Sequence, residues 1–152
     1  MAVQTRQDNS TTPLILDGYS FAKNGTIAQD AVRTIPLAFG TVMAYNTADM
    51  EWVPFTALTN LEGESVPQGI FLGNAITAAA MVAGDTEDQP ILVGGSAVLN
   101  EDELVWDQDL QTADSVISAA AAVPYFVISA AQCLGMFGLY IQVSEAIDAF
   151  EN

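Results

Sequence analysis

The chain has 152 residues, of which 19 are Asp or Glu, three are Lys or Arg and none is His, so its formal charge at pH 7 is −16. This balance argues against nucleic acid and anionic membranes as partners, because both are bound through Lys and Arg. Hydrophobic residues make up 51% and charged residues 14% of the chain, a composition typical of a folded globular domain. With Cys133 as its one cysteine, the chain has no internal disulfide.

The charge is unevenly distributed along the chain. The first 33 residues hold all three bases and three acids, so they are neutral, whereas residues 34–152 hold 16 acids and no base. The acidic part can form an ion pair only with the amino-terminal segment or with a partner, so burial and hydrogen bonding must stabilise it. We expect its acids at the surface, where salt relieves their repulsion. The split favours either simple solubility or a neutral docking segment on an acidic, solvent-facing body.

The amino-terminal segment is predicted to be an extended arm. Residues 1–12 are polar, lack a periodic apolar pattern and precede Pro13. The apolar run at residues 14–16 is long enough for one strand. Such a strand suits addition to the sheet edge of another chain, and the alternative is pairing within its own domain. We place the arm at residues 1–18 and one further domain at residues 19–152.

The middle of the chain is predicted to be rich in strands. Short β-branched and aromatic runs, bounded by Gly, Pro and Asn, recur at regular intervals, which is typical of a compact β domain. Turns are expected at Asn24-Gly25 and at residues 84–88, and residues 75–83 are ambiguous between helix and strand. The strands are expected at residues 36–45, 52–55, 66–73, 91–99 (with a glycine bend) and 104–106.

The carboxyl-terminal region has a different pattern. From Leu110 to Ala121 the apolar residues follow helical spacing, which predicts a helix ended by a proline. The 30 uncharged residues between Asp114 and Glu145 also suggest a membrane span, but polar residues dilute the run and no Lys or Arg flanks it, so buried structure is favoured. Residues 139–143 predict a final strand. The expected fold class is β-rich α+β: a compact domain of small strands with a C-terminal helical segment and an extended N-terminal arm.

No catalytic or metal-binding motif stands out in the sequence. Without His, Ser-His-Asp and Cys-His arrangements are impossible within the chain. Cys133 lies in an apolar stretch without a nearby base, so we expect an inert core residue. Acidic clusters at residues 85–88, 101–103 and 107–109 suggest calcium, but the last departs from the EF-hand pattern, and solvated turns are favoured. We therefore expect no enzyme, cofactor or metal; a calcium-dependent binding module or hydrolase is the alternative.

The order of several segments resembles that of a known family. The segments are PLAFGTVMAY, EWVPF, VPQGIFLG, an Ala-rich stretch ending in AGD, and PILVGGSAVLNEDELVW. Together they resemble the head decoration (capsid cement) proteins of tailed bacteriophages, the lambda-like capsid-stabilising group. The resemblance is best over residues 36–106, and TPLILDG near the amino terminus is similar to the TPLxLD stretch that precedes the β-rich body in that family.

The resemblance implies a structural virion protein, made in the host cytoplasm. Such a protein binds the outer surface of an expanded icosahedral capsid as a homotrimer at local threefold positions and stabilises it against internal pressure. Its partners are the major capsid protein and its own copies, and its arm orders by adding a strand to the capsid. Another virion component, such as a tail or fibre-base protein, is an alternative. The expected capsid-binding residues are Arg6, Thr12, Pro13, Leu14, Ile15 and Leu16.

Overall fold

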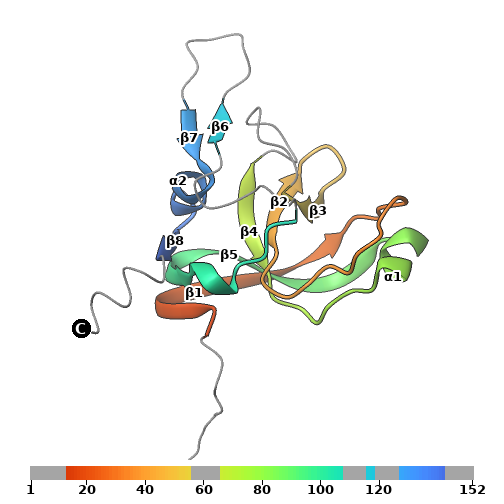
Figure 1. The fold of residues 1–152 in the computed structure, drawn as a ribbon, viewed down its shortest axis with the longest axis horizontal. Helices are drawn as coiled ribbons and strands as arrows, with labels where there is room; N and C mark the ends of the chain where they lie inside the picture. Colours follow the sequence, from red (N-terminus) through yellow and green to blue (C-terminus); the bar gives the residue numbers. More distant parts are fainter. Residues whose placement is uncertain (1–12, 56–65, 108–115, 119–126, 143–152) are drawn as a thin grey trace, which may run out of the picture.

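The structure, a computed structural model, describes residues 13–55, 66–107, 116–118 and 127–142 (Figure 1). Strands dominate it, and the helices are short. The strands are β1 (Ile15–Ile27), β2 (Val42–Asn46), β3 (Glu51–Pro54), β4 (Pro67–Phe71), β5 (Thr86–Asn100), β6 (Val116–Ser118), β7 (Val127–Ser129) and β8 (Leu139–Gln142). The helices are α1 (Ala78–Ala83), α2 (Ala130–Gly135) and the 3-10 helix η3 (Glu101–Glu103).

Five strands form a small closed barrel in the order β1-β3-β2-β4-β5, with β5 pairing back onto β1. The closure between β1 and β3 consists of one pair, Ile27 with Trp52, next to a hydrogen bond from the Ala28 amide to the Trp52 carbonyl. β8 adds to β5 outside this ring, and β6 pairs with β7 in a separate two-stranded sheet. The strand-rich prediction is therefore confirmed.

β1 and β5 form a long antiparallel ribbon, from Ile15 opposite Leu99 to Ile27 opposite Thr86. Two predictions in this region were wrong. Asn24-Gly25 lies inside β1, and much of the turn predicted at residues 84–88 belongs to β5. Local turn signals were overridden here because both strands gain a continuous ladder of partners. The predicted glycine bend in β5 is a bulge at Val93, where Phe21 faces Gly94 and Ala22 faces Leu92.

β5 changes partners along its length. Its first half pairs with β4 through Leu92, and its second half pairs in parallel with β8, beginning at Ala97 opposite Leu139. The chain enters β8 at Gly138, whose φ is +85° and where a Cβ would lie 2.0 Å from the Gly95 carbonyl oxygen. Only glycine fits this close backbone approach. β8 confirms the final strand predicted at residues 139–143, and its burial alternates, since Leu139 is fully buried and Tyr140 is half exposed.

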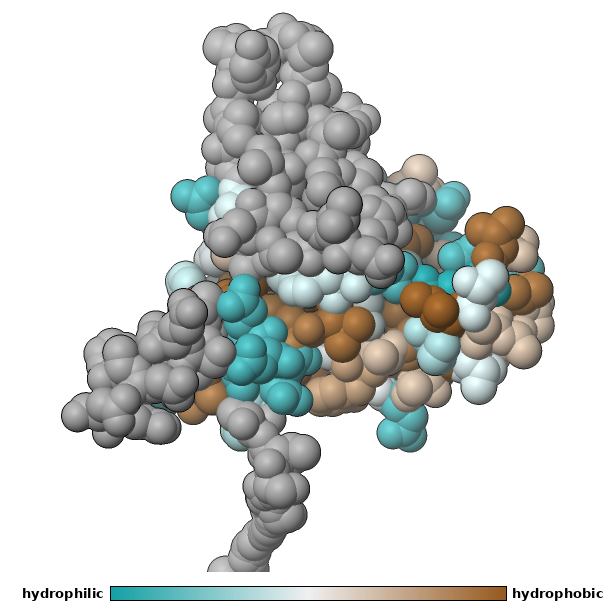
Figure 2. All heavy atoms as spheres, viewed as in Figure 1, coloured by the Kyte–Doolittle hydropathy of each residue, from teal (hydrophilic) through white to brown (hydrophobic). Residues whose placement is uncertain are grey.

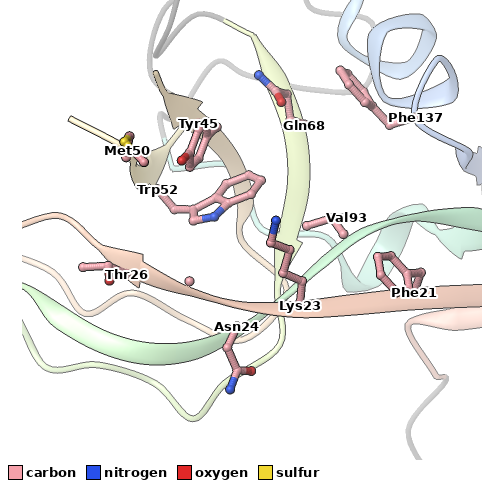
Figure 3. Close-up of a pocket in the computed structure, with 11 residues that line it drawn as sticks. Phe21, Lys23, Asn24, Thr26, Tyr45, Met50, Trp52, Gln68, Val93 and Phe137 are labelled. Atoms are coloured by element: carbon pink, nitrogen blue, oxygen red, sulfur yellow. The ribbon is translucent and has the colours of Figure 1, made fainter. Parts of the chain in front are cut away.

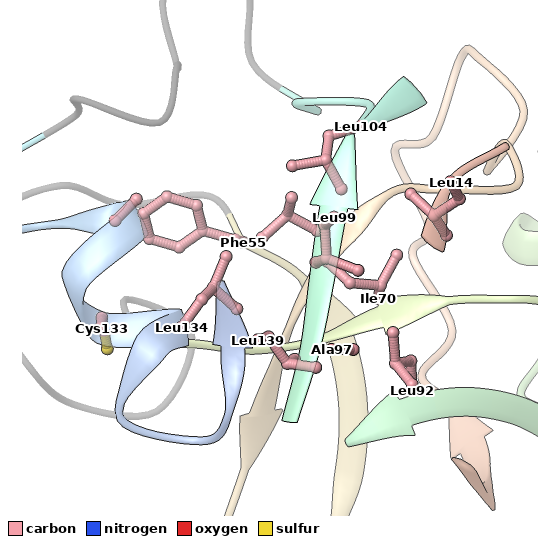
Figure 4. Packing of buried hydrophobic residues seen from close by; sticks show 12 residues of the cluster. Leu14, Phe55, Ile70, Leu92, Ala97, Leu99, Leu104, Cys133, Leu134 and Leu139 are labelled. Carbon is pink, nitrogen blue, oxygen red and sulfur yellow. The ribbon is translucent and has the colours of Figure 1, made fainter. Parts of the chain in front are cut away.

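The core consists of two clusters on opposite faces of the sheet, because neighbouring residues of a strand alternate between them. Ile70 and Leu92 belong to the cluster covered by α2 and β8, which Figure 4 shows with Phe55, Leu134 and Leu139 gathered around Leu99. Phe71 and Ile91 belong to the other cluster. Its remaining buried members are Ile27, Leu37, Met43, Trp52, Ile76 and Met81.

The described helices are brief and begin at capping side chains. Thr77 caps α1, and Ser129 and Gln132 form a reciprocal capping box at the start of α2. The helix predicted from Leu110 to Ala121 was wrong where it is described, since Val116–Ser118 form β6. The rest of that segment lies outside the described residues. In the described part of the chain, no helix has the length and apolarity needed to cross a membrane.

Candidate functional site

The predicted docking residues lie around the start of β1. Pro13 is exposed, whereas Leu14 is buried in the core and its carbonyl accepts a hydrogen bond from the Asn100 amide at 2.8 Å. Ile15 and Leu16 are half-buried first residues of β1, which pairs with β5. Of the two alternatives for this run, pairing within its own domain is the one found, so the barrel begins before residue 18. Arg6 and Thr12 lie outside the described residues.

The division of charge at residue 33 is not a structural boundary. β1 contributes a whole barrel strand from the neutral segment, and Arg33 forms the ion pair that the charge distribution allowed. Its guanidinium donates two hydrogen bonds to the Asp107 carboxylate, at 2.8 and 2.7 Å, and further bonds to the carbonyls of Ile35 and Pro36. The two charged side chains are only 6% and 11% exposed. Arg33 therefore has a structural role.

The acidic clusters show no metal-binding arrangement where they are described. Residues 101–103 form η3, whose first turn is capped by the Asn100 side chain. Within the described ranges, no group of three or more Cys, Asp or Glu side chains is arranged to hold a metal ion. Asp85 accepts a hydrogen bond from the Gln29 amide at 2.8 Å, which lowers the pKa of Asp85. Glu51 shares a hydrogen bond with Asp85, which raises the pKa of Glu51.

Cys133 is a core residue, as predicted. It is 3% exposed, and its Sγ donates a hydrogen bond to the Pro67 carbonyl at 3.5 Å. Burial raises the pKa of the Cys133 thiol to about 11. Because the thiolate is the reactive form, this side chain is inert at neutral pH.

A hollow of approximately 480 Å³ lies where β1 and β3 diverge from their single pair (Figure 3). Its size falls within the usual range for ligand sites. Five aromatic or aliphatic side chains from separate elements converge on it: Phe21, Tyr45, Trp52, Val93 and Phe137. The other lining residues are Lys23, Asn24, Gly25, Thr26, Met50 and Gln68.

Trp52 is the fixed wall of this hollow. Its ring packs against Tyr45 with centroids 5.1 Å apart and planes tilted by 59°. Two glycines make room for it, since a Cβ on Gly25 would lie 2.6 Å from Trp52 Cδ1 and a Cβ on Gly69 would lie 3.1 Å from Trp52 Cζ3. Trp52 is 8% exposed, so most of its surface is held in the core and one part faces the hollow. The hollow is thus preformed.

Lys23 supplies the charge of the hollow. It extends from β1 toward the space between Trp52 and Val93 (Figure 3). The described residues contain two cations, Lys23 and Arg33, and Lys23 has no carboxylate partner among them. An unpaired ammonium among aromatic side chains is suited to binding a carboxylate attached to an apolar group.

Further apolar side chains are exposed on the described surface, as Figure 2 shows for one face. Tyr19, Phe21, Met50 and Phe137 lie on or beside the elements around the hollow, with Tyr19 70% and Met50 71% exposed. A second, shallower hollow of approximately 430 Å³ lies between α2 and β8 and is lined by Met136 and Tyr140. Neither hollow was predicted, and the residues of the first come from elements distant in the sequence.

The sequence matches no protein-family model, and no curated protein matches it.

Proposed function

We propose that this chain is a capsid decoration protein that binds the outer surface of an expanded icosahedral phage capsid as a homotrimer. In this proposal it sits at local threefold positions and clamps neighbouring capsid subunits against internal pressure. Residues 1–13 serve as the docking arm, and the barrel is the rigid body to which the arm is attached. The acidic surface of the body faces solvent.

The observation that carries the proposal is the way the chain joins the arm to the barrel. Leu14, directly after the arm, is buried in the core, and β1 continues from Ile15 in a long ladder with β5. Tension on the arm is therefore transferred to many backbone hydrogen bonds and to a packed side chain. A clamp needs such a firm attachment between arm and barrel, because each arm would otherwise detach by local unfolding of the first strand.

This arrangement assigns different roles to the predicted docking residues. Arg6, Thr12 and Pro13 belong to the part proposed to contact the capsid, with Arg6 pairing with acidic shell residues. Leu14 and Ile15 anchor the arm instead, because their side chains pack against the core. Three arms on one trimer bind with a high effective local concentration, which raises avidity by roughly 10²–10⁴ over a single arm.

The test is to mix the purified chain with expanded, undecorated capsids of the phage that encodes it and to image the particles. The proposal predicts added density at the local threefold positions. Rings or spikes of the protein without capsid binding would instead indicate a tail or fibre-base component. Capsids that stay undecorated, together with tight Ca²⁺ binding by the chain in a calorimetric titration, would favour the calcium-dependent binding module or hydrolase.

A further inference from the structure

β1 has an open edge beside the hollow. Along one edge it pairs with β5 over its whole length, but on its other edge the described residues supply one strand partner, Trp52 of β3 opposite Ile27. From that pair the two strands diverge, and the hollow fills the wedge between them (Figure 3). Backbone amides and carbonyls on such an edge are available to another strand.

The wedge offers pockets as well as backbone groups. A strand laid along β1 would place alternate side chains toward the hollow, where Phe21, Trp52 and Val93 form an apolar surface. Phe21 is 52% and Phe137 is 36% exposed, so both have surface to bury on a partner. An aromatic or large aliphatic side chain suits this space.

The positive charge of Lys23 determines which polar group of a partner fits this site. Lys23 lies in the same wedge without a carboxylate partner among the described residues, so a carboxylate gains an ion pair there while an ammonium is repelled. The surrounding acids repel a polyanion over longer distances, since the chain carries −16. One acidic residue beside an apolar one therefore matches the site better than an acidic run.

We propose that the wedge between β1 and β3 binds an extended peptide segment of a partner protein, with an aromatic or large aliphatic side chain in the hollow and one carboxylate on Lys23. The segment pairs with the open edge of β1. It thereby extends the single-pair contact between β1 and β3 into a continuous sheet. This site is separate from the arm, and the proposal holds whether or not the partner is a capsid protein.

The experiment uses an array of capped, extended hexapeptides as the probe. One position carries Phe or Ser, and the position two residues later carries Glu, Gln or Lys. Binding to the full chain is measured by fluorescence in a Trp106→Phe background, which leaves Trp52 as the one tryptophan. We expect the Phe and Glu combination to bind at least tenfold more tightly than the Phe and Lys combination.

Two variants and one modified peptide decide the outcome. Lys23→Met should abolish the preference for Glu, whereas Val32→Glu, which changes the net charge equally at an exposed side chain outside the hollow, should retain it. N-methylation of the peptide amides should weaken binding at least tenfold, because it blocks pairing with β1. A preference for Glu that survives Lys23→Met, or binding that N-methylation leaves unchanged, would overturn the proposal.

Other occupants give distinct results. If phenylacetate binds as tightly as the best peptide, the site takes small carboxylates and the peptide proposal fails. If Lys23→Glu dissociates an oligomer of the chain in solution, the occupant is a second copy, and the proposal is equally overturned. Neither result depends on capsid binding, so failure here is separable from failure of the proposed function.

Discussion

Lys23 and Arg33 lie ten residues apart, and their surroundings give them opposite roles. Arg33 is enclosed, with a bidentate carboxylate partner and two backbone carbonyls that accept its remaining hydrogen bonds. Lys23 extends into an open aromatic hollow and has no such partner in the described residues. The comparison teaches that in a chain with so few cations, charge alone does not mark a binding residue. What marks a binding residue is whether its hydrogen-bond donors already have partners within the protein.

The largest expected difference between the two cations is in stability. Arg33→Met leaves Asp107 nearly buried without its partner, so we expect the free energy of unfolding to fall by about 3–5 kcal/mol. Lys23→Met should change it by less than about 0.5 kcal/mol, because Lys23 has no buried partner to lose. Urea denaturation of the two variants measures both values. Equal losses would contradict the division into a structural and an available cation.

The second prediction concerns the wall of the hollow. Gly25→Ala forces a Cβ against Trp52, so we expect a loss of about 1–3 kcal/mol in the free energy of unfolding and weaker binding of the peptide probe. Gly84→Ala is the matched control, since nothing lies within 4 Å of its added Cβ, and its φ of 169° is ordinary extended backbone. A Gly25→Ala variant as stable as the control would show that Trp52 is not held tightly there.

The sequence predicted some of this molecule and missed the rest for identifiable reasons. Strand patterns held where one face is buried, as at residues 139–142, where Leu139 is buried and Tyr140 is exposed. Asn24-Gly25 usually marks a turn, yet here it lies in a strand paired with β5, and the glycine is needed because the ring of Trp52, 27 residues later, occupies the space of a side chain. Such a contact has no local signal.

The functional site was missed for the same reason. The aromatic residues around Lys23 come from β1, β2, β3 and the segment after α2, so no short motif contains them. The predicted docking run also included the buried Leu14, because an apolar triplet beside a polar segment does not reveal which side chains face the core. Charge distribution was more informative, since it restricted ion pairs of the acidic part to the amino-terminal segment, and Arg33 forms one.

The third prediction distinguishes the repulsion among surface acids from the attraction within the enclosed Arg33–Asp107 ion pair. Apart from Asp107, the described acids are at least partly exposed, so raising NaCl from near zero to 0.5 M should screen their repulsion and raise Tm by roughly 2–4 °C. The loss of stability caused by Arg33→Met should persist at both salt concentrations, because salt screens an enclosed ion pair only weakly. A wild-type Tm that falls steadily with moderate salt, measured by circular dichroism, would contradict the surface repulsion.

The smallest expected effect concerns the pH dependence of the exposed pair Glu51 and Asp85. The raised pKa of Glu51 means that the folded state binds its proton more tightly, so this group adds stability as pH falls through its folded pKa and is unfavourable at neutral pH. The lowered pKa of Asp85 acts oppositely, and its stabilisation is lost only at lower pH. Glu51→Gln should therefore be slightly more stable than wild type at pH 7, and equal to it only well below the ordinary pKa of glutamate, where the carboxyl is protonated in both the folded and the unfolded state.

Thermal melts across this pH range check the Glu51 prediction. Asp49→Asn serves as the control, since it removes one nearby negative charge without removing the carboxylate that bonds to Asp85. If Glu51→Gln were less stable than wild type at pH 7, the shared hydrogen bond would be favourable in its ionised form, opposite to the direction of the Glu51 pKa.

The central claim, that the arm docks the barrel onto a capsid, is tested most directly by deleting residues 1–12 and measuring co-sedimentation with expanded, undecorated capsids. Leu14 and β1 remain in this variant, so the barrel should keep its unfolding transition while capsid binding falls by at least a hundredfold, in line with the avidity of three arms. Binding equal to that of the full chain, by a variant that is equally stable, would contradict the claim.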